Sequence, residues 1–149
     1  MTIKVILDAN IFLSYLLAPA TERPITRIVR ACFTDDIDLI VPPELLAEIT
    51  DKLQNKRYFR ECVPQTLIAN FVQQMTALTD LLAPLEAIPA FSRDPDDDYL
   101  LAYGIMNDVD YLVTADLDLL VLKQVELVSI VRPQTFLDIL SELGFRQTQ

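Results

Sequence analysis

Acidic side chains at four separate places in the chain could carry polar chemistry: Asp8, Glu48, the run Asp94–Asp98, and the pair Asp116 and Asp118. The sequence contains no histidine. This excludes Ser-His-Asp and Cys-His nucleophiles, histidine general acids and histidine metal ligands. The two cysteines stand alone, without the spacing of a zinc site. Any catalytic chemistry must therefore come from carboxylates, lysine, tyrosine or a bound metal ion.

Acids brought together in one pocket need a proton or a cation to relieve their repulsion. Two like charges about 4 Å apart repel by about 4 kcal/mol at an effective dielectric of about 20. Three or four carboxylates in one pocket would therefore hold protons or bind a cation. Ligands that are all oxygen atoms favour a hard ion, Mg²⁺ or Mn²⁺. A water molecule kept by such an ion and placed against a phosphodiester is a nucleophile for hydrolysis.

Polar and basic residues near these acids could complete such a site. Asn10 shares the first loop with Asp8, and its amide could orient a metal-bound water molecule or a carboxylate. Thr114 is placed to hydrogen-bond Asp8 or a phosphate oxygen. The densest basic run follows Glu48 and could guide an RNA backbone toward the acids. It consists of Lys52, Lys56, Arg57 and Arg60.

The elements that must position these residues alternate between strands and helices. Buried apolar runs predict strands at 3–7, 38–41, 111–113 and 127–131. Helical spacing predicts helices at 24–33, from 42 to about 53, and at 64–82, 94–106, 118–123 and 133–143, with a connection at 83–91. The Asp8-Ala9-Asn10 segment is typical of a strand that enters a helix. This alternation indicates an α/β fold of three layers, with a central parallel sheet of about four to five strands.

The parallel sheet gives a test of whether the acids converge. Ligands of such sheets bind beyond the carboxyl ends of the strands. Asp8 follows the first strand directly and Asp116 follows the strand 111–113 by one turn, so both should open onto the same edge. Glu48, about two turns into its helix, and Asp98, in the first turn of its helix, could reach that edge too.

Composition limits the class of protein. With 149 residues, of which 52% are hydrophobic, the chain is expected to form one compact domain over residues 1–149. No apolar run is long enough to cross a bilayer and no signal peptide is recognisable, so we expect a cytoplasmic protein. The net charge of −10 opposes long-range attraction of a nucleic acid, unless a bound cation reverses the charge locally.

Each candidate also has a purely structural interpretation. Asp8 or Asn10 could cap a helix, and Asp116 with Asp118 could do the same. Glu48 could pair with Lys52 one turn away. The Asp94–Asp98 run could compensate a helix dipole, and the basic run could be a solvated face. What favours a site is that two strand ends and two helices direct acids to one edge.

The order of these segments resembles the signature of the PIN-domain family. The resemblance extends from Ile3 to Leu140 and lies in Asp8-Ala9-Asn10, in Leu45-Leu46-Ala47-Glu48-Ile49, in Asp98-Tyr99-Leu100-Leu101-Ala102 and in Thr114-Ala115-Asp116-Leu117-Asp118.

The resemblance implies a metal-dependent ribonuclease on a parallel sheet, and the toxin half of a VapC-like toxin–antitoxin pair. It implies that Asp8, Glu48, Asp98 and Asp116 are the catalytic, metal-binding acids. Asp118 is then an auxiliary acid, with Asn10 and Thr114 in support. Asp98 fits the motif best, although Asp94 or Asp97 could contribute. A homodimer and an antitoxin are the implied protein partners, and the long apolar stripe at 64–82 is the expected interface.

Two other functions remain open. A phosphatase of the haloacid-dehalogenase type would use Asp8 as nucleophile, but such enzymes carry a second acid two residues later, where this chain has Asn10. A non-catalytic module would use the helix at 64–82 to bind a protein. Cleavage of single-stranded RNA that is lost in Asp8→Asn separates the nuclease from both.

Overall fold

A five-stranded sheet forms the centre of the computed structural model, which describes residues 2–83, 85 and 98–144. The strands lie in the order β2-β1-β3-β5-β4. The first four in this order are parallel, and β4 is antiparallel to β5. Their bounds are Ile3–Leu7 for β1, Ile37–Leu39 for β2, Tyr111–Val113 for β3, Gln124–Val125 for β4 and Val128–Val131 for β5.

Helices fill the connections between these strands, and three of them begin with proline in the first turn, where its missing N–H costs nothing. The helices within the described residues are α1 (Ala9–Leu17), α2 (Pro24–Cys32), α3 (Pro43–Asn55), α4 (Arg57–Cys62), α5 (Gln65–Thr79), α6 (Asp98–Met106), α7 (Leu117–Leu120) and α8 (Pro133–Glu142).

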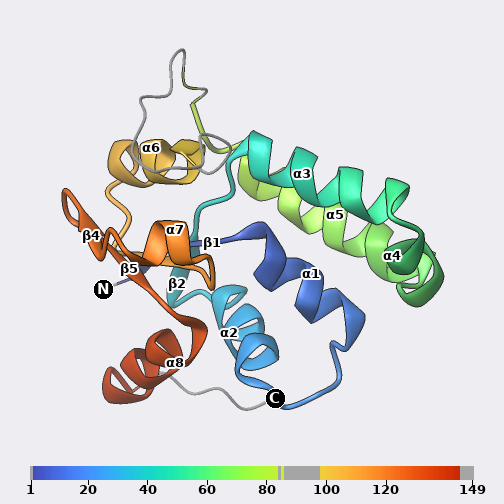
Figure 1. The fold of residues 1–149 in the computed structure, drawn as a ribbon, viewed down its shortest axis with the longest axis horizontal. Coiled ribbons are helices and arrows are strands. Elements are labelled where there is room, and N and C mark those ends of the chain that lie inside the picture. The colour runs from blue at the N-terminus through green and yellow to red at the C-terminus, as the bar shows by residue number, and fades with distance from the viewer. Residues whose placement is uncertain (1, 84, 86–97, 145–149) are drawn as a thin grey trace.

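The sheet is covered on both sides (Figure 1). Helix α6 packs against β1, β3 and β5 on one side, while α2 contacts β2 and α8 contacts β3 on the other. Helix α3 packs against α1 and α5. Val5, Ile6 and Leu7 of β1 have no accessible surface, as expected for a strand covered on both faces. The three-layer α/β/α architecture predicted from the sequence is therefore confirmed.

Two elements were not predicted. The short strand β4 forms a hairpin with β5 through Glu126 and Leu127, and the positive φ of Glu126 (53°) allows this tight turn. The strand expected at 127–131 therefore begins one residue later. Helix α4 buries none of its residues, so no apolar periodicity signals it in the sequence. The helix expected at 118–123 is shorter in the structure, where α7 ends at Leu120. Lys123 lies beyond the end of the helix and has a φ of 61°.

The ends of the other predicted helices agree with the structure to within a few residues. The last helix ends at Glu142, and Gly144 follows with a φ of 82°, the left-handed conformation that favours glycine after a helix. The first part of the helix expected at 94–106 lies outside the described residues, as does most of the connection at 83–91. Within the part of the chain that is described, no helix has the length and apolarity to cross a membrane.

Candidate functional site

Asp8 and Thr114 lie side by side where two neighbouring strands end. The Asp8 N–H donates to the Val113 carbonyl (3.0 Å), and the Thr114 N–H donates to the Val131 carbonyl (3.0 Å), so both residues continue the ladders beyond β1 and β3. The Thr114 hydroxyl donates to Asp8 Oδ2 at 2.7 Å. Both side chains are buried, Asp8 with 6% of its surface exposed and Thr114 with none. The carboxyl edge of the sheet thus holds a buried carboxylate in a fixed orientation.

The same hydroxyl connects Asp8 to Asp116. The Asp116 N–H donates to Thr114 Oγ1 at 3.0 Å, and the Asp118 N–H donates to Asp116 Oδ1 at 2.9 Å. Since an amide N–H can only donate, the Thr114 oxygen accepts from Asp116 and its own hydrogen goes to Asp8. The convergence of Asp8 and Asp116 on one edge, predicted from the two strand ends, is what the structure shows.

Burial and neighbouring charges act on the Asp8 carboxyl. Desolvation raises its pKa, and the hydrogen bonds from Thr114 and from the Ala9 backbone oppose this increase. The negative charges of Glu48 and Asp116 raise the pKa further. Glu48 belongs to α3, which is far from Asp8 in sequence, so its charge acting on Asp8 shows that this helix brings a third acid toward the edge.

Both carboxylate oxygens of Glu48 have partners. The Tyr99 hydroxyl donates to Oε1 at 3.0 Å, and Lys52 Nζ donates to Oε2 at 3.2 Å. About one third of each side chain of the ion pair is exposed, 31% for Lys52 and 34% for Glu48. Tyr99 lies buried in the first turn of α6. Glu48 is therefore held between two helices, α3 and α6.

Asp98 is at the end of α6 that faces the site. Its neighbour Tyr99 reaches Glu48, whereas Asn107, just after the helix, accepts a hydrogen bond from Lys4 at the other edge of the sheet. The helix thus begins at the carboxyl edge. Asp98 is 2% exposed. The alternative acids Asp94 and Asp97 lie outside the described residues.

The structural interpretations are correct for some of these residues. Asp8 occupies the N-cap position of α1 but makes no capping hydrogen bond with its side chain, so helix capping does not account for it. Asp116 does cap α7 with Oδ1. Glu48 pairs with Lys52 as the spacing allowed. Asn10 is exposed in the first turn of α1, and within the described residues no hydrogen bond joins it to Asp8.

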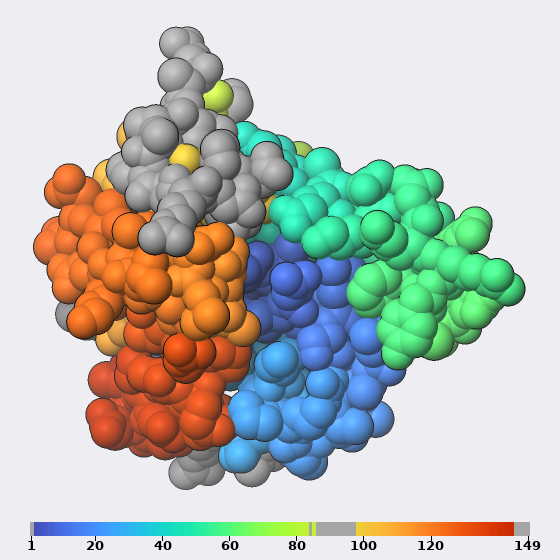
Figure 2. Space-filling model, viewed as in Figure 1, coloured from blue at the N-terminus to red at the C-terminus, as the bar shows by residue number. Residues whose placement is uncertain are grey.

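The predicted basic run divides into paired and exposed residues. Lys52 is bound to Glu48, and Arg57 Nε donates to Glu61 Oε1 at 2.7 Å. Lys56 and Arg60 are exposed. In Figure 2, the α1 residues (dark blue) lie recessed between α3 (teal) and α7 (orange), with α4 (green) beyond α3.

The donor atoms suit a hard cation in kind. Asp8, Glu48 and Asp116 offer only carboxylate oxygens, and the effect of their charges on the pKa of Asp8 shows that they lie near one another. In the described part of the chain, however, no group of three or more acids or cysteines has the arrangement needed to hold a metal ion. The donor atoms are therefore of the kind that a hard divalent cation prefers, but the described side chains do not form a closed set of ligands.

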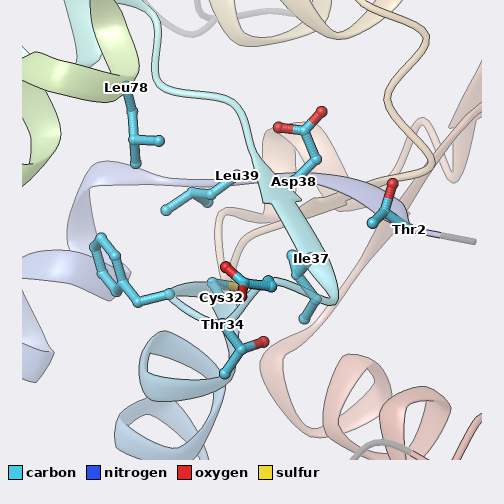
Figure 3. A pocket seen from close by; sticks show the side chains of 9 residues that line it. Thr2, Cys32, Thr34, Ile37, Asp38, Leu39 and Leu78 are labelled. Atoms are coloured by element: carbon cyan, nitrogen blue, oxygen red, sulfur yellow. The ribbon is translucent and has the colours of Figure 1, made fainter.

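A pocket elsewhere contains none of the predicted residues. It lies at the opposite edge of the sheet, between the start of β2 and the end of α2, with Thr2, Cys32 and Ile37 in its lining (Figure 3). Cys32 is buried there, and burial raises the pKa of its thiol above the ordinary value. A raised pKa disfavours the thiolate, the form in which a cysteine reacts or binds a metal ion.

Tyr99 is the contact that the sequence analysis did not identify. In the sequence it stands next to Asp98, within a segment that resembles the PIN-domain signature. A hydroxyl next to an acid in the first turn of a helix is the one signal that could have singled it out. Which acid that hydroxyl binds depends on how α6 packs against α3, and one sequence does not specify this.

Comparison with known proteins gives one result. A family model described as "PIN domain" matches residues 4–118. Comparison with curated proteins and with solved structures gave no match. The matched segment covers more than half of the chain and includes the four predicted acids and Thr114. The chain therefore belongs to the PIN domain family.

Proposed function

We propose that this chain is a metal-dependent endoribonuclease that hydrolyses phosphodiester bonds of RNA, with one PIN domain over residues 1–149. The observation that carries the proposal is the bond from the buried Thr114 hydroxyl to Asp8, with Asp116 attached to the same oxygen. PIN domains are in general nucleases. The pKa of the Asp8 carboxyl is raised by burial and, further, by the charges of two other acids, and a hard cation bound there would relieve both effects.

The acids have distinct parts in this proposal. Asp8, Glu48, Asp98 and Asp116 would hold the metal ion, and Asp118 would be an auxiliary acid. Mg²⁺ or Mn²⁺ bound there would supply an activated water molecule and positive charge against the phosphate. Thr114 fixes Asp8 in one orientation through its hydrogen bond to Oδ2. Asn10 would be a supporting polar group, exposed in the first turn of α1.

The RNA must approach an acidic protein from the side where its basic residues lie. Lys56 and Arg60 are exposed beyond α3, and both could contact backbone phosphates. Arg57 is also exposed, although it pairs with Glu61. An exposed ion pair contributes little free energy, so an RNA phosphate could replace Glu61 as the partner of this arginine at small cost.

The finer assignment is a VapC-like toxin, in the cytoplasm, with a homodimer and a cognate antitoxin as partners. The apolar stripe of α5 was the expected interface, but Phe71 and Met75 from that stripe are buried in the core. Strongly exposed apolar side chains occur at α7, directly after it and in the β4–β5 hairpin, where Leu117, Val121 and Leu127 are 63%, 66% and 84% exposed, and also just after α5, where Leu81 is 79% exposed. We propose the surface around α7 and the hairpin for a protein partner.

The test is cleavage of single-stranded RNA by the purified chain with Mg²⁺, Mn²⁺ or a chelator. We expect cleavage only with a metal ion, and its loss in Asp8→Asn. Asp38→Asn is the matched control, because Asp38 is an exposed aspartate on β2. Intact RNA with hydrolysis of a small phosphomonoester would replace the nuclease by the phosphatase. Intact RNA and no hydrolysis would leave the non-catalytic module.

A further inference from the structure

Glu48 is held on each of its two oxygens by a different kind of group. Oε2 accepts from the Lys52 ammonium at 3.2 Å, and Oε1 accepts from the Tyr99 hydroxyl at 3.0 Å. Lys52 lies one turn further along the same helix, whereas Tyr99 comes from α6. One oxygen is therefore neutralised by a cation, and the other is oriented by an uncharged donor.

These two contacts have opposite consequences for a metal ion. An ammonium and a divalent cation compete for the same carboxylate oxygen, because each neutralises its charge and they repel each other. A hydroxyl on the other oxygen leaves the negative charge in place and fixes the direction of the carboxylate. It therefore assists a metal ion that binds through Oε2.

The burial of the two partners agrees with this division. Lys52 is 31% exposed, so its ammonium can leave Glu48 and enter water without crossing the core. Tyr99 is 7% exposed and is fixed in α6 beside Asp98. The Lys52 ammonium can therefore move away from Glu48, whereas the buried Tyr99 side chain keeps its place.

We propose that Lys52 is a built-in counter-ion that occupies Glu48 Oε2 until Mg²⁺ or Mn²⁺ binds, and that Tyr99 is the residue that positions Glu48 for the metal ion. The inference rests on the proposed metal-dependent function. Lys52 thus lowers the affinity of the site for metal ions, and Tyr99 raises it. The charge of Lys52 also offsets the repulsion between Glu48 and Asp8 while no metal ion is bound.

The experiment measures Mn²⁺ binding, from the free-ion signal in electron paramagnetic resonance, for the full chain and four variants. Lys52→Gln is paired with Lys56→Gln, which removes the same charge from an exposed residue directly after the end of α3, four residues further along the chain. Tyr99→Phe is paired with Tyr103→Phe, which removes a hydroxyl from α6 that accepts from the Leu85 N–H and interacts with Glu44, an acid outside the proposed site. The melting temperature of each metal-free variant reports any purely structural effect.

We expect Lys52→Gln to bind Mn²⁺ about two- to fivefold more tightly than the wild type, the range for a partly exposed ion pair. We expect Tyr99→Phe to bind it about three- to tenfold more weakly, because a hydrogen bond to a charged group is lost. Both control variants should stay within about twofold of the wild type.

The inference is overturned if Lys52→Gln binds Mn²⁺ no more tightly than Lys56→Gln, or if Tyr99→Phe binds it as well as Tyr103→Phe. If the wild type binds Mn²⁺ and cleaves RNA in either case, the proposed function stands without the inference. If neither the wild type nor Lys52→Gln binds Mn²⁺, the inference and the proposed metal-dependent function fail together.

Discussion

Replacing Thr114 with valine removes one hydroxyl and leaves the shape of a fully buried side chain almost unchanged. It leaves two groups without a partner, Asp8 Oδ2 and the Asp116 N–H. A hydrogen bond to a buried charged group contributes about 1.5–3 kcal/mol, and a partly buried amide left unpaired costs about 1 kcal/mol. We expect Thr114→Val to lower the free energy of unfolding by about 3 kcal/mol at neutral pH.

That loss is large enough to measure directly. For a chain of this length, about 3 kcal/mol corresponds to a decrease in melting temperature of about 10 °C. The assay is urea and thermal unfolding of the metal-free protein, followed by circular dichroism. Thr114→Ser is the control, because serine keeps the hydroxyl and loses only a buried methyl group, at about 1 kcal/mol.

The pH dependence distinguishes the hydroxyl from simple packing. The Thr114 hydrogen bond lowers the pKa of Asp8, so it stabilises the ionised form. The cost of Thr114→Val should therefore be largest above the folded pKa of Asp8 and decrease as the pH falls through it. Equal costs at neutral and acidic pH, or a larger cost for serine than for valine, would refute the reasoning.

Three further results follow from the same contacts. Burial raises the pKa of Asp8 in the folded state above its value in the unfolded state, so ionised Asp8 destabilises the fold. Without a metal ion, Asp8→Asn should therefore have a larger free energy of unfolding than the wild type at neutral pH. This difference should vanish at acidic pH, where Asp8 is protonated in both states. Mn²⁺ should raise the melting temperature of the wild type and leave that of Asp8→Asn unchanged; equal shifts would contradict the site. With Asp8→Asn as the background to prevent cleavage, adding Lys56→Gln and Arg60→Gln should weaken binding of single-stranded RNA severalfold and reduce its salt dependence by about one to two in slope, as filter binding can show.

The strand ends were predictable because their placement follows from the alternation of elements. Once β1 and β3 are expected to be parallel neighbours, Asp8 and Asp116 must lie on the same edge. The Thr114 contact was among the predicted possibilities for the same reason, since it follows the last residue of β3. For these residues, the order of the strands predicts which side chains share an edge, whereas the sequence leaves the partner of the Thr114 hydroxyl open between Asp8 and a phosphate oxygen.

The helix-borne groups were harder to predict because their placement depends on packing. The spacing of Glu48 and Lys52 allowed an ion pair, but it did not show that the pair would lie against Tyr99 of α6. The hairpin of β4 and β5 was not predicted because its turn needs a positive φ at Glu126. Glycine and asparagine are the residues that indicate such a turn in a sequence, and glutamate is not. Helix α4 was missed because it buries no side chain.

The distribution of charge explains how a chain with a net charge of −10 can be proposed to act on a polyanion. The repulsion between RNA and Asp8, Glu48 and Asp116 is short-ranged at physiological salt, where screening acts over about 8 Å. A divalent cation among these acids neutralises most of that local negative charge. It also weakens the attraction between the Lys52 ammonium and the Glu48 carboxylate. The released ammonium then lies four residues before Lys56, which directly follows α3, so binding of the metal ion also adds a positive charge to the side from which RNA would approach. We infer that binding of the metal ion and of RNA are coupled through α3, and such coupling must be reciprocal: RNA should raise the affinity for Mn²⁺ by the same factor by which Mn²⁺ raises the affinity for RNA.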